Sequence, residues 1–317
     1  MTPRQRIIAA LKLQQPDDVV PTFELFGLTK ELTGKDFIVL DGLAGRALES
    51  GIKHNAELHV EIAERLDYSA IVLGNIPIIK ELVRMGADRT YLLTHKNGDG
   101  TWRFWREGNG YPDSFEETCL RLFTEPDEFK RELDRATNDT IEHMKPLIDA
   151  GIEAIFMGAD YATTKGPFLS PKMFGEFIAP CLHRTISGHR ENGAYVIKHT
   201  DGNIMPILDQ IVACSPDALV SIDPTAGMDI AMVKKLVGNR VCLGGNVDMD
   251  PLMSGDREKI RKSALYCLKH AKPGGGYIFM SSNSVYPPIK IEDYLMMLEL
   301  RDEYGRYDRQ VEIPDLH

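Results

Sequence analysis

Short apolar runs alternate with longer amphipathic segments along most of the chain. Short runs rich in β-branched residues are typical of buried strands, and apolar positions at helical spacing are typical of helices. The predicted strands occupy residues 19–26, 69–73, 154–157, 195–197, 219–222, 241–243 and 277–280. Because such strands alternate with helices and the helix-to-strand loops are short, the pattern predicts a parallel sheet covered by helices.

Capping and helix-breaking residues place the helices between these strands. The opening Thr2-Pro3-Arg4-Gln5 is a capping box with proline in the first turn, which predicts a helix to about residue 13. Ser170-Pro171 begins another helix, which Pro180 should kink and Gly193 should end. The remaining predicted helices cover residues 48–66, 127–150, 204–213, 229–237, 257–270 and 291–304.

One stretch, Tyr91 to Trp105, departs from this alternation. Asn97-Gly98-Asp99-Gly100 stands there between two β-prone arms, which is a signal for a β-hairpin. We interpret the stretch as an insertion that leaves the main domain and forms a flap.

The number of strand–helix units favours a closed barrel over an open sheet. Roughly seven or eight units over this length fit a (β/α)8 barrel, which carries its site at the carboxyl ends of the strands. An open sheet would instead concentrate its polar residues at one switch point. No internal repeat or linker divides the chain. We therefore predict one α/β domain over residues 1–317, a (β/α)8 TIM barrel with a β-hairpin insertion.

Composition narrows the class of protein further. Apolar residues at 43% and charged residues at 26% describe a soluble globular protein, and a net charge of −10 argues against a nucleic-acid or anionic membrane surface. The apolar run 7–11 is too short for a signal peptide, and no stretch could span a bilayer. Five cysteines without a Cys-x-x-Cys pair fit reduced thiols. We expect a cytoplasmic protein with neither nucleic-acid nor membrane partners.

Polar residues follow nearly every predicted strand, and they form the candidate site. The set is Glu24, Asn75, Asp160, His199, Asp201, Asp223, Asn246, Asp248, Ser282 and Asn283. A single Asp or Asn at such a position is often a turn or cap residue, which is the interpretation we favour for Asp248 and leave open for Ser282. His199 alone could be a core histidine bonded to a backbone carbonyl. The whole set is harder to explain in that way, because a polar residue would have to follow each strand by an independent coincidence.

Several segments together resemble the uroporphyrinogen decarboxylase-like superfamily, and their order and spacing agree over almost the whole chain. They are Asp160 with Ser170-Pro171-Lys172-Met173-Phe174, His199-Thr200-Asp201-Gly202-Asn203, Ala226-Gly227-Met228-Asp229, Gly245-Asn246-Val247-Asp248 and Gly275-Gly276-Tyr277-Ile278. The resemblance implies a (β/α)8 barrel with its site at the carboxyl mouth.

The resemblance leaves two branches of that superfamily open. Its decarboxylases carry an arginine-rich N-terminal segment that grips the substrate's carboxylates, whereas residues 21–34 here contain no arginine and offer Glu24. A glutamate would repel a polyanionic porphyrinogen at short range. This favours the branch of methyltransferases that take a methyl group from a methylcorrinoid, with porphyrinogen decarboxylase as an alternative.

The superfamily's thiol methyltransferases use His-x-Cys at the central strand and a second cysteine near the last strand, which help to hold zinc. Here the first position is Asp201 and the second region is residues 281–284, so both expected thiolates are absent. We therefore expect no metal, although His199, Asp201 and Glu24 could compose an N/O site. A zinc-dependent, coenzyme M-type thiol methyltransferase remains an alternative.

The missing thiolates point to a nitrogen acceptor of the methyl group. A thiol is mostly protonated at neutral pH and gains from zinc, whereas a neutral amine already offers its lone pair. We expect tetrahydrofolate, with His199 and Asp201 as catalytic residues that manage the proton lost by its N5 atom. Carboxylates could accept the paired donors of the pterin, and amides could bind its other edges. The expected substrate-binding residues are Glu24, Asn75, Asp160, Asp223, Asn246 and Asn283.

The methyl donor is expected to come from outside the chain. No helix-cradled Asp-x-His-x-x-Gly segment is available to ligate cobalt. We therefore expect a separate corrinoid protein, or free methylcobalamin in an assay. A barrel that binds a ligand without turnover is a third class left open, in which mutation of His199 and Asp201 would change affinity only.

Overall fold

The computed structural model describes residues 1–73, 76–86, 88–95, 115–309 and 312–314. Within these residues, seven strands form one parallel sheet, in the order β1-β2-β3-β6-β7-β8-β9. Its strands are β1 (Ala70–Leu73), β2 (Thr90–His95), β3 (Ala154–Gly158), β6 (Tyr195–Thr200), β7 (Ala218–Ser221), β8 (Cys242–Val247) and β9 (Tyr277–Ser281). A two-residue pair, β4 (Ala162–Thr163) and β5 (Gly166–Pro167), is antiparallel. The fold is therefore α/β with a parallel sheet, as predicted.

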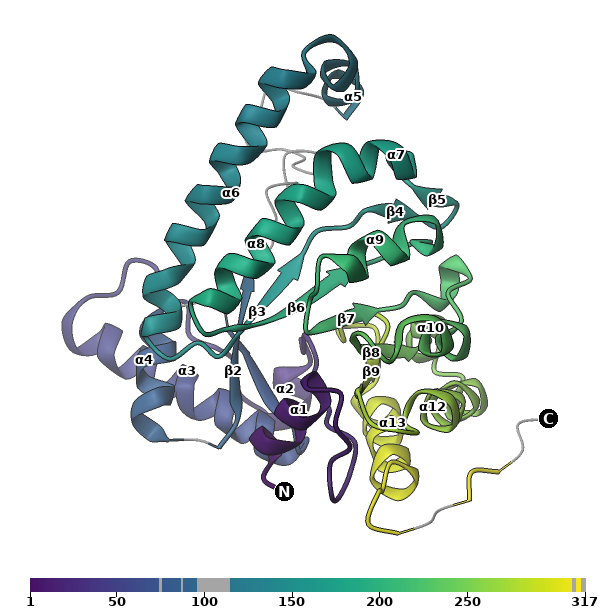
Figure 1. Ribbon diagram of the computed structural model, residues 1–317. Coiled ribbons are helices and arrows are strands. Elements are labelled where there is room, and N and C mark those ends of the chain that lie inside the picture. Colours follow the sequence, from purple (N-terminus) through teal and green to yellow (C-terminus); the bar gives the residue numbers. More distant parts are fainter. Residues whose placement is uncertain (74–75, 87, 96–114, 310–311, 315–317) are drawn as a thin grey trace.

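Helices connect the strands and cover the outside of the sheet (Figure 1). The longer helices are α1 (Pro3–Leu11), α3 (Gly45–Arg65), α4 (Ile76–Met85), α5 (Phe115–Thr124), α6 (Pro126–Asp149), α8 (Ala179–Glu191), α10 (Ile230–Val237), α12 (Arg257–Ala271) and α13 (Ile291–Tyr304). The shorter ones are α2 (Thr29–Thr33), α7 (Pro171–Met173), α9 (Leu208–Ala213) and α11 (Met249–Ser254). None of the helices in the described ranges is both long enough and apolar enough to cross a bilayer.

The predicted caps form as the sequence indicates. The Thr2 side chain accepts a hydrogen bond from the Gln5 amide and the Gln5 side chain bonds back to Thr2, so α1 begins with a complete capping box. A π-helical turn, Phe174–Ile178, precedes α8 and lies just before Pro180. Because proline cannot donate the usual helical hydrogen bond, it disturbs the helix at the position where a kink was predicted.

The N-terminal segment from Val19 to Phe26 is not the continuous strand that the sequence predicts. It makes isolated parallel bridges, Thr22 with Phe279 and Phe26 with Val285. Its backbone nevertheless meets both edges of the sheet: Thr22 O accepts a 2.7 Å bond from the Ser69 amide before β1, and Pro21 O accepts a 2.9 Å bond from the Phe279 amide in β9.

The predicted hairpin insertion is wrong for its first arm. Thr90–His95 is β2, a strand of the main sheet that pairs in parallel with β1 and β3. The remainder of the predicted insertion, residues 96–105, lies outside the described residues. A strand of the main sheet therefore occupies the first arm of the predicted insertion.

Candidate functional site

Three of the predicted residues meet at the carboxyl ends of the neighbouring strands β3 and β6. His199 pairs in register with Gly158 at the end of β3, which brings the following Asp160 beside it. The Nε2 atom of His199 lies 3.7 Å from Asp160 Oδ1 and 3.6 Å from Asp201 Oδ1. The imidazole also stacks on Phe156, with 5.6 Å between ring centroids. These contacts place one histidine between two carboxylates, and we call Asp160, His199 and Asp201 the carboxylate–histidine cluster.

Asp201 is fixed by hydrogen bonds from two other strand exits. Asn283 Nδ2 donates a 2.8 Å bond to its Oδ2 atom. The Ser221 hydroxyl lies within reach of both Asp201 Oδ1 and the Ser282 carbonyl, and can donate to one of them at a time. The Asp201 amide in turn donates to Asp160 Oδ1 over 2.9 Å. Residues at or just after the ends of β3, β7 and β9 thus all bond to Asp201, which follows β6.

These contacts set the charge of the Asp201 carboxylate. Burial alone would raise its pKa, but the nearby His199, Ser221 and Asn283 outweigh burial and hold the pKa below its usual value. Asp201 is therefore ionised at neutral pH.

Backbone geometry explains why these side chains converge. Gly202, directly after Asp201, has φ +83°, and a Cβ there would lie 2.4 Å from the Ala162 carbonyl oxygen. Only glycine allows the turn after β6 to approach β4 this closely. Thr200 Oγ1 accepts a 3.0 Å bond from the Tyr161 amide, which ties the exits of β3 and β6 together. Asp201 is therefore held at its position by its sequence neighbours on both sides.

The end of β7 adopts a backbone conformation that side chains rarely allow. Ser221 and Ile222 have φ of +86° and +50°. For a β-branched residue such as Ile222 this conformation is an outlier that costs about 1–3 kcal/mol, and such residues gather at functional sites. Here the unusual backbone occurs at the residue whose hydroxyl contacts Asp201.

Other predicted residues serve the fold instead of the cluster. Asn246 is 4% exposed and donates to the carbonyls of Ile222 and Met228, while its Oδ1 accepts from the Cys267 thiol. Both polar atoms of its amide are therefore engaged in hydrogen bonds inside the protein. Asp248 caps α11 by accepting from the Asp250 amide, as its turn-residue interpretation predicts.

Asp223 stands at the edge of the site but is largely occupied. Its Oδ1 atom accepts from the amide and the hydroxyl of Thr225, which caps a short 3-10 turn. Its Oδ2 atom accepts a longer, 3.3 Å bond from the Gly202 amide. Asp223 thereby supports the turn that carries Asp201. Asn75, another predicted binding residue, lies outside the described residues.

Glu24 does not join the cluster either. It is 2% exposed, and its Oε1 atom accepts a 2.5 Å bond from the Ser281 amide. The N/O site of His199, Asp201 and Glu24 that the sequence left possible does not form, because among the described residues Asp160 is the third member of the group. Burial raises the pKa of Glu24 to about 8, against the opposing effect of the Ser281 hydrogen bonds.

The cluster offers a donor set of one nitrogen and two oxygens. One ligand atom each from Asp160, His199 and Asp201 lie within 4.8 Å of one another, and no other such group occurs within the described part of the chain. All five cysteines lie in that part without forming a disulfide, and none belongs to the cluster. The donor set fits a divalent cation with N/O preference and lacks the thiolates that zinc favours in thiol-activating sites.

Sequence reasoning missed three residues that shape the site: Ser221, Phe156 and Lys198. Lys198 is fully buried, and its Nζ atom donates to the carbonyls of Ala159 and His199 over 2.6 and 2.8 Å. It also lies 4.2 Å from the centroid of the Tyr161 ring. A lysine inside an otherwise apolar strand was the available signal, because lysine is almost never fully buried without partners.

These features define an α/β protein whose parallel sheet carries a polar cluster at its carboxyl edge, as enzymes of this architecture do. The sequence profile of the family described as "Uroporphyrinogen decarboxylase (URO-D)" matches residues 106–304. The chain belongs to this family. That result confirms the resemblance at the level of the superfamily, and the methyltransferase branch remains a prediction.

Comparisons with individual proteins agree with this membership. The chain is 25% identical over 193 residues to a uroporphyrinogen decarboxylase of Pseudoalteromonas translucida, covering 58% of this chain and 50% of that protein. It is 28% identical over 188 residues to one of Coxiella burnetii, covering 56% and 48%. The chain thus spans about half the length of the curated relatives it matches.

A solved structure supports the fold over nearly the whole chain. A methyltransferase from Methanosarcina mazei superposes with a TM-score of 0.74 and 19% identity, covering 96% of this chain and 99% of that one. At this identity the likeness concerns the fold alone.

Proposed function

We propose that the protein is an enzyme that transfers a methyl group from a methylcorrinoid to tetrahydrofolate, without zinc. The observation that carries this proposal is the carboxylate–histidine cluster, in which Asp201 stands where the thiol-methylating members of the superfamily place a thiolate ligand. A site without thiolates suits an acceptor that needs no metal to become a nucleophile. We propose a cytoplasmic location, with the corrinoid on a separate protein.

The proposed reaction needs a base, and His199 is placed to act as one. As the bond between N5 and the methyl carbon forms, the bond between the methyl group and the donor breaks, and its electron pair stays on the corrinoid. The proton that N5 then releases passes to His199 Nε2. Asp160 and Asp201, at 3.7 and 3.6 Å, stabilise the imidazolium that results.

Of the predicted binding carboxylates, Asp160 is the one best placed to meet the acceptor. Its side chain is 46% exposed, and only its Oδ1 atom is used by the hydrogen bond from the Asp201 amide. Paired N–H donors of a pterin match a carboxylate in geometry. Asn283, which already bonds Asp201, would contact the same molecule.

We also propose that the sheet is closed into a (β/α)8 barrel by the N-terminal segment around Thr22. The bridges from this segment to β9 and the hydrogen bond from Ser69 support that arrangement. Closure would place the exits of all strands around one mouth, as in other barrels of this type.

The acceptor is identified by a spectroscopic assay. The protein is incubated with methylcobalamin and, in parallel, with tetrahydrofolate, coenzyme M or homocysteine, and loss of the methylcobalamin spectrum is followed. We expect turnover with tetrahydrofolate only. Turnover with a thiol, together with stoichiometric zinc in the purified protein and inhibition by chelator, would overturn the assignment in favour of the zinc-dependent alternative.

Decarboxylation of a porphyrinogen is the second candidate, because the curated relatives carry that name. It predicts carbon dioxide release from uroporphyrinogen without any donor or acceptor. The absence of arginine from residues 21–34 argues against it, since the one cation of that segment, Lys30, is exposed and already paired with Asp36, whereas Glu24 would repel the carboxylates of the substrate. An assay for carbon dioxide decides between the two reactions.

A further inference from the structure

A second site is suggested by a cavity of about 350 Å³ between α3, β1 and the segments around residues 25 and 285. Its wall is mainly apolar, and includes Leu25, Phe26, Ile62, Ile71, Val72 and Val285. None of its lining residues belongs to the carboxylate–histidine cluster. Small-molecule sites in proteins are commonly concave, mainly apolar and furnished with few polar groups.

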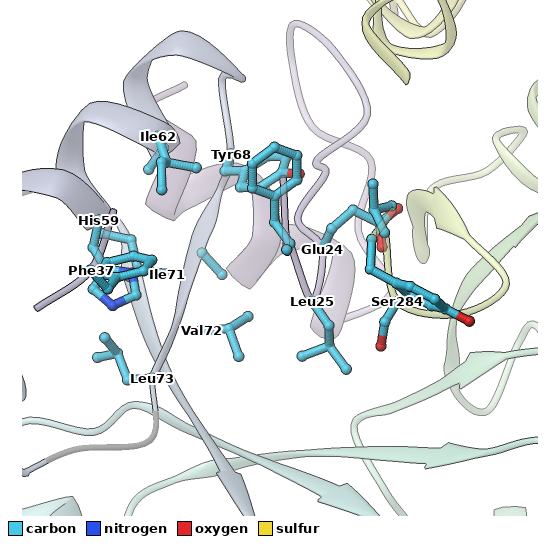
Figure 2. Close-up of a pocket in the computed structure, with 16 residues that line it drawn as sticks. Glu24, Leu25, Phe37, His59, Ile62, Tyr68, Ile71, Val72, Leu73 and Ser284 are labelled. Atoms are coloured by element: carbon cyan, nitrogen blue, oxygen red, sulfur yellow. The ribbon is translucent and has the colours of Figure 1, made fainter. Parts of the chain in front are cut away.

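The distinctive polar group in this wall is Glu24, which lies between Tyr68 and Ser284 in Figure 2. Its Oε1 atom is bonded by the Ser281 amide. Its Oε2 atom is buried and, among the residues that the structure describes, has no hydrogen-bond partner. A buried polar atom without a partner costs about 1–3 kcal/mol, so such an atom in a cavity wall indicates a group that a ligand completes.

The surroundings decide which form of Glu24 a ligand meets. Tyr68 and Tyr294 are the titratable groups that interact with Glu24, and His59 lines the same cavity; none of the three supplies a positive charge near neutral pH. Burial lowers the pKa of His59 to about 4, so its ring is neutral there. Burial also raises the pKa of both tyrosines well above their usual value, and their hydroxyls bond each other over 2.5 Å.

A carboxyl group that is buried without a cation keeps its proton, and burial accordingly raises the pKa of Glu24 to about 8. With Oε1 accepting from Ser281, the proton resides on Oε2, which then carries a donor without a partner in a residue that lines the cavity. The matching ligand group is a hydrogen-bond acceptor. An anionic ligand would have no cation to pair with in this cavity. A cationic ligand would lose its hydration in an apolar environment, which is energetically unfavourable.

We propose that this cavity is a binding site for a neutral, mainly apolar molecule of about two fused rings, which presents one hydrogen-bond acceptor to Glu24. Tyr68 and the aromatic ring of Phe26 supply flat surfaces for such rings. The cavity shares no residue with the carboxylate–histidine cluster, so the binding proposal does not depend on the proposed methyl transfer. Its nearest link to the cluster is the stretch from Ser281, which bonds Glu24, to Asn283, which bonds Asp201.

Two probes of equal shape test the hydrogen bond. Isoquinoline and naphthalene differ by one ring nitrogen, which is an acceptor in isoquinoline, and their affinities are measured by NMR titration at about pH 7. We expect isoquinoline to bind the wild-type protein at least about fivefold more tightly than naphthalene, as one hydrogen bond of about 1 kcal/mol implies. Equal affinities would overturn the role of Glu24, and binding of neither probe would overturn the site.

Matched variants separate the hydrogen bond from charge and from folding. Glu24→Gln keeps a donor beside the Ser281 amide and should keep the preference for isoquinoline, whereas Glu24→Leu should abolish it. Val72→Phe fills the cavity and should weaken both probes together. Loss of the preference in Glu24→Gln, or its survival in Glu24→Leu, would contradict the proposal.

A pH series on the folded wild-type protein gives a second measure that needs no destabilised variant. Isoquinoline affinity should fall as the pH rises through about 8, because the Glu24 carboxyl then loses the proton it donates. Naphthalene affinity should stay constant, and so should the affinity of Glu24→Gln for isoquinoline. A wild-type affinity for isoquinoline that stays the same up to about pH 9 would overturn the protonated-donor assignment.

Discussion

At the scale of single residues, two carboxyl groups of this protein are driven in opposite directions by their surroundings. Glu24 sits in an apolar wall with one backbone donor, and burial raises its pKa to about 8. Asp201 is also partly buried, but His199, Ser221 and Asn283 more than offset burial and lower its pKa. Strongly shifted pKa values of this kind are common at functional positions.

Glu24 should make the stability of the fold depend on pH. Its folded pKa of about 8 exceeds the unfolded value of 4.5, so its stabilising contribution is complete below about 4.5 and disappears as the pH rises toward 8. Between these limits the wild-type free energy of unfolding should fall, relative to that of Glu24→Gln, on the order of 1 kcal/mol per pH unit. Urea unfolding of both proteins across this range gives the difference, and parallel pH dependences would contradict the prediction.

Asp201 should matter for the rate of the proposed methyl transfer and little for folding. Asp201→Asn removes the charge that stabilises a protonated His199, so we expect the rate to drop about 10²- to 10³-fold, in the usual range for general acid–base groups. Asp248→Ser is the matched control, because it changes another strand-exit aspartate and retains a capping side chain on α11. A rate of Asp201→Asn equal to that of the control would remove Asp201 from the mechanism.

At the scale of elements, the polar strand exits were predictable but their convergence was not. The sequence places Asp160 after one strand and His199 and Asp201 after another, with about 40 residues of chain between them. Only the sheet order shows that these strands, β3 and β6, are neighbours. Asn246 is a strand-exit residue of the same kind, yet its amide is taken up by two backbone carbonyls. The sequence contains no sign of that difference, because it depends on which loops pack together.

Two further errors have similar physical causes. The Asn-Gly-Asp-Gly stretch after residue 96 is a strong local turn signal, and it favours a hairpin that would include Thr90–His95. In the structure that segment instead pairs in parallel within the main sheet. Ser221 was overlooked because one small hydroxyl between Val220 and Ile222 looks like part of an apolar strand. Its left-handed backbone, which turns the hydroxyl to Asp201, is not visible in the residue pattern.

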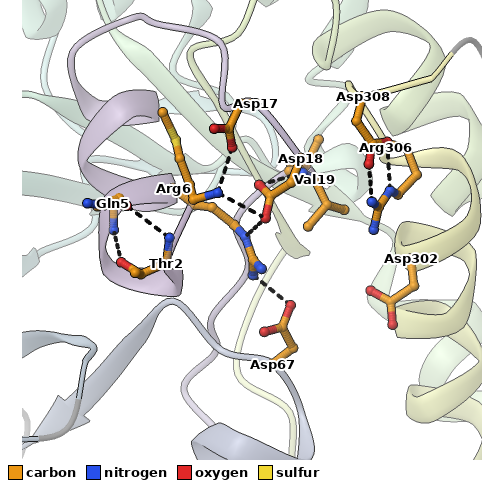
Figure 3. A network of polar contacts seen from close by, with 12 residues as sticks. Thr2, Gln5, Arg6, Asp17, Asp18, Val19, Asp67, Asp302, Arg306 and Asp308 are labelled. Atoms are coloured by element: carbon orange, nitrogen blue, oxygen red, sulfur yellow. Dashed lines mark hydrogen bonds and ion pairs between the residues drawn. The ribbon is translucent and has the colours of Figure 1, made fainter.

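At the opposite end of the sheet, ion pairs join α1 and α13 to two acidic residues outside the helices, Asp18 and Asp67. Figure 3 shows Arg6 between Asp18 and Asp67, at 2.8 and 2.7 Å. Asp67 also pairs with Arg301 of α13 over 3.0 Å. Arg301 is fully buried and donates to the Val20 carbonyl over 2.8 Å, so it joins α13 to the N-terminal segment as well.

Loss of Arg301 should therefore destabilise the fold markedly. Arg301→Leu leaves the Val20 carbonyl without its donor and weakens the hold on Asp67, which we expect to cost about 2–4 kcal/mol, less than a fully buried pair because Asp67 is 40% exposed. Chemical denaturation measures the change. Arg306→Leu is the control, since its partner Asp308 is exposed and surface pairs contribute little. Similar losses in the two variants would show that the buried network is not special.

At the scale of the whole molecule, the question is what covers the two edges of the sheet. β1 and β9 are the outer strands, and uncovered edges present unpaired backbone groups. The N-terminal segment meets both, through the Ser69 amide on one side and the Phe279 amide on the other. Phe23 anchors that segment in the core, where it is fully buried and packs edge-on against Phe156. One short segment thus has the contacts needed to close the sheet around the carboxylate–histidine cluster.

Hydrogen exchange tests this closure directly. If the segment closes the sheet, the amides of Ser69 and Phe279 should exchange as slowly as those of the central strand β6, because all would open only with the core. Phe23→Ala removes the anchor and should release both amides while those of β6 stay protected, at a cost of about 3–5 kcal/mol to the fold. Leu268→Ala, an equally buried change on α12, is the control and should lower stability without selectively exposing Ser69 and Phe279. Fast exchange at these two amides in the wild-type protein would mean an open sheet, and the proposal of a closed barrel would then be wrong.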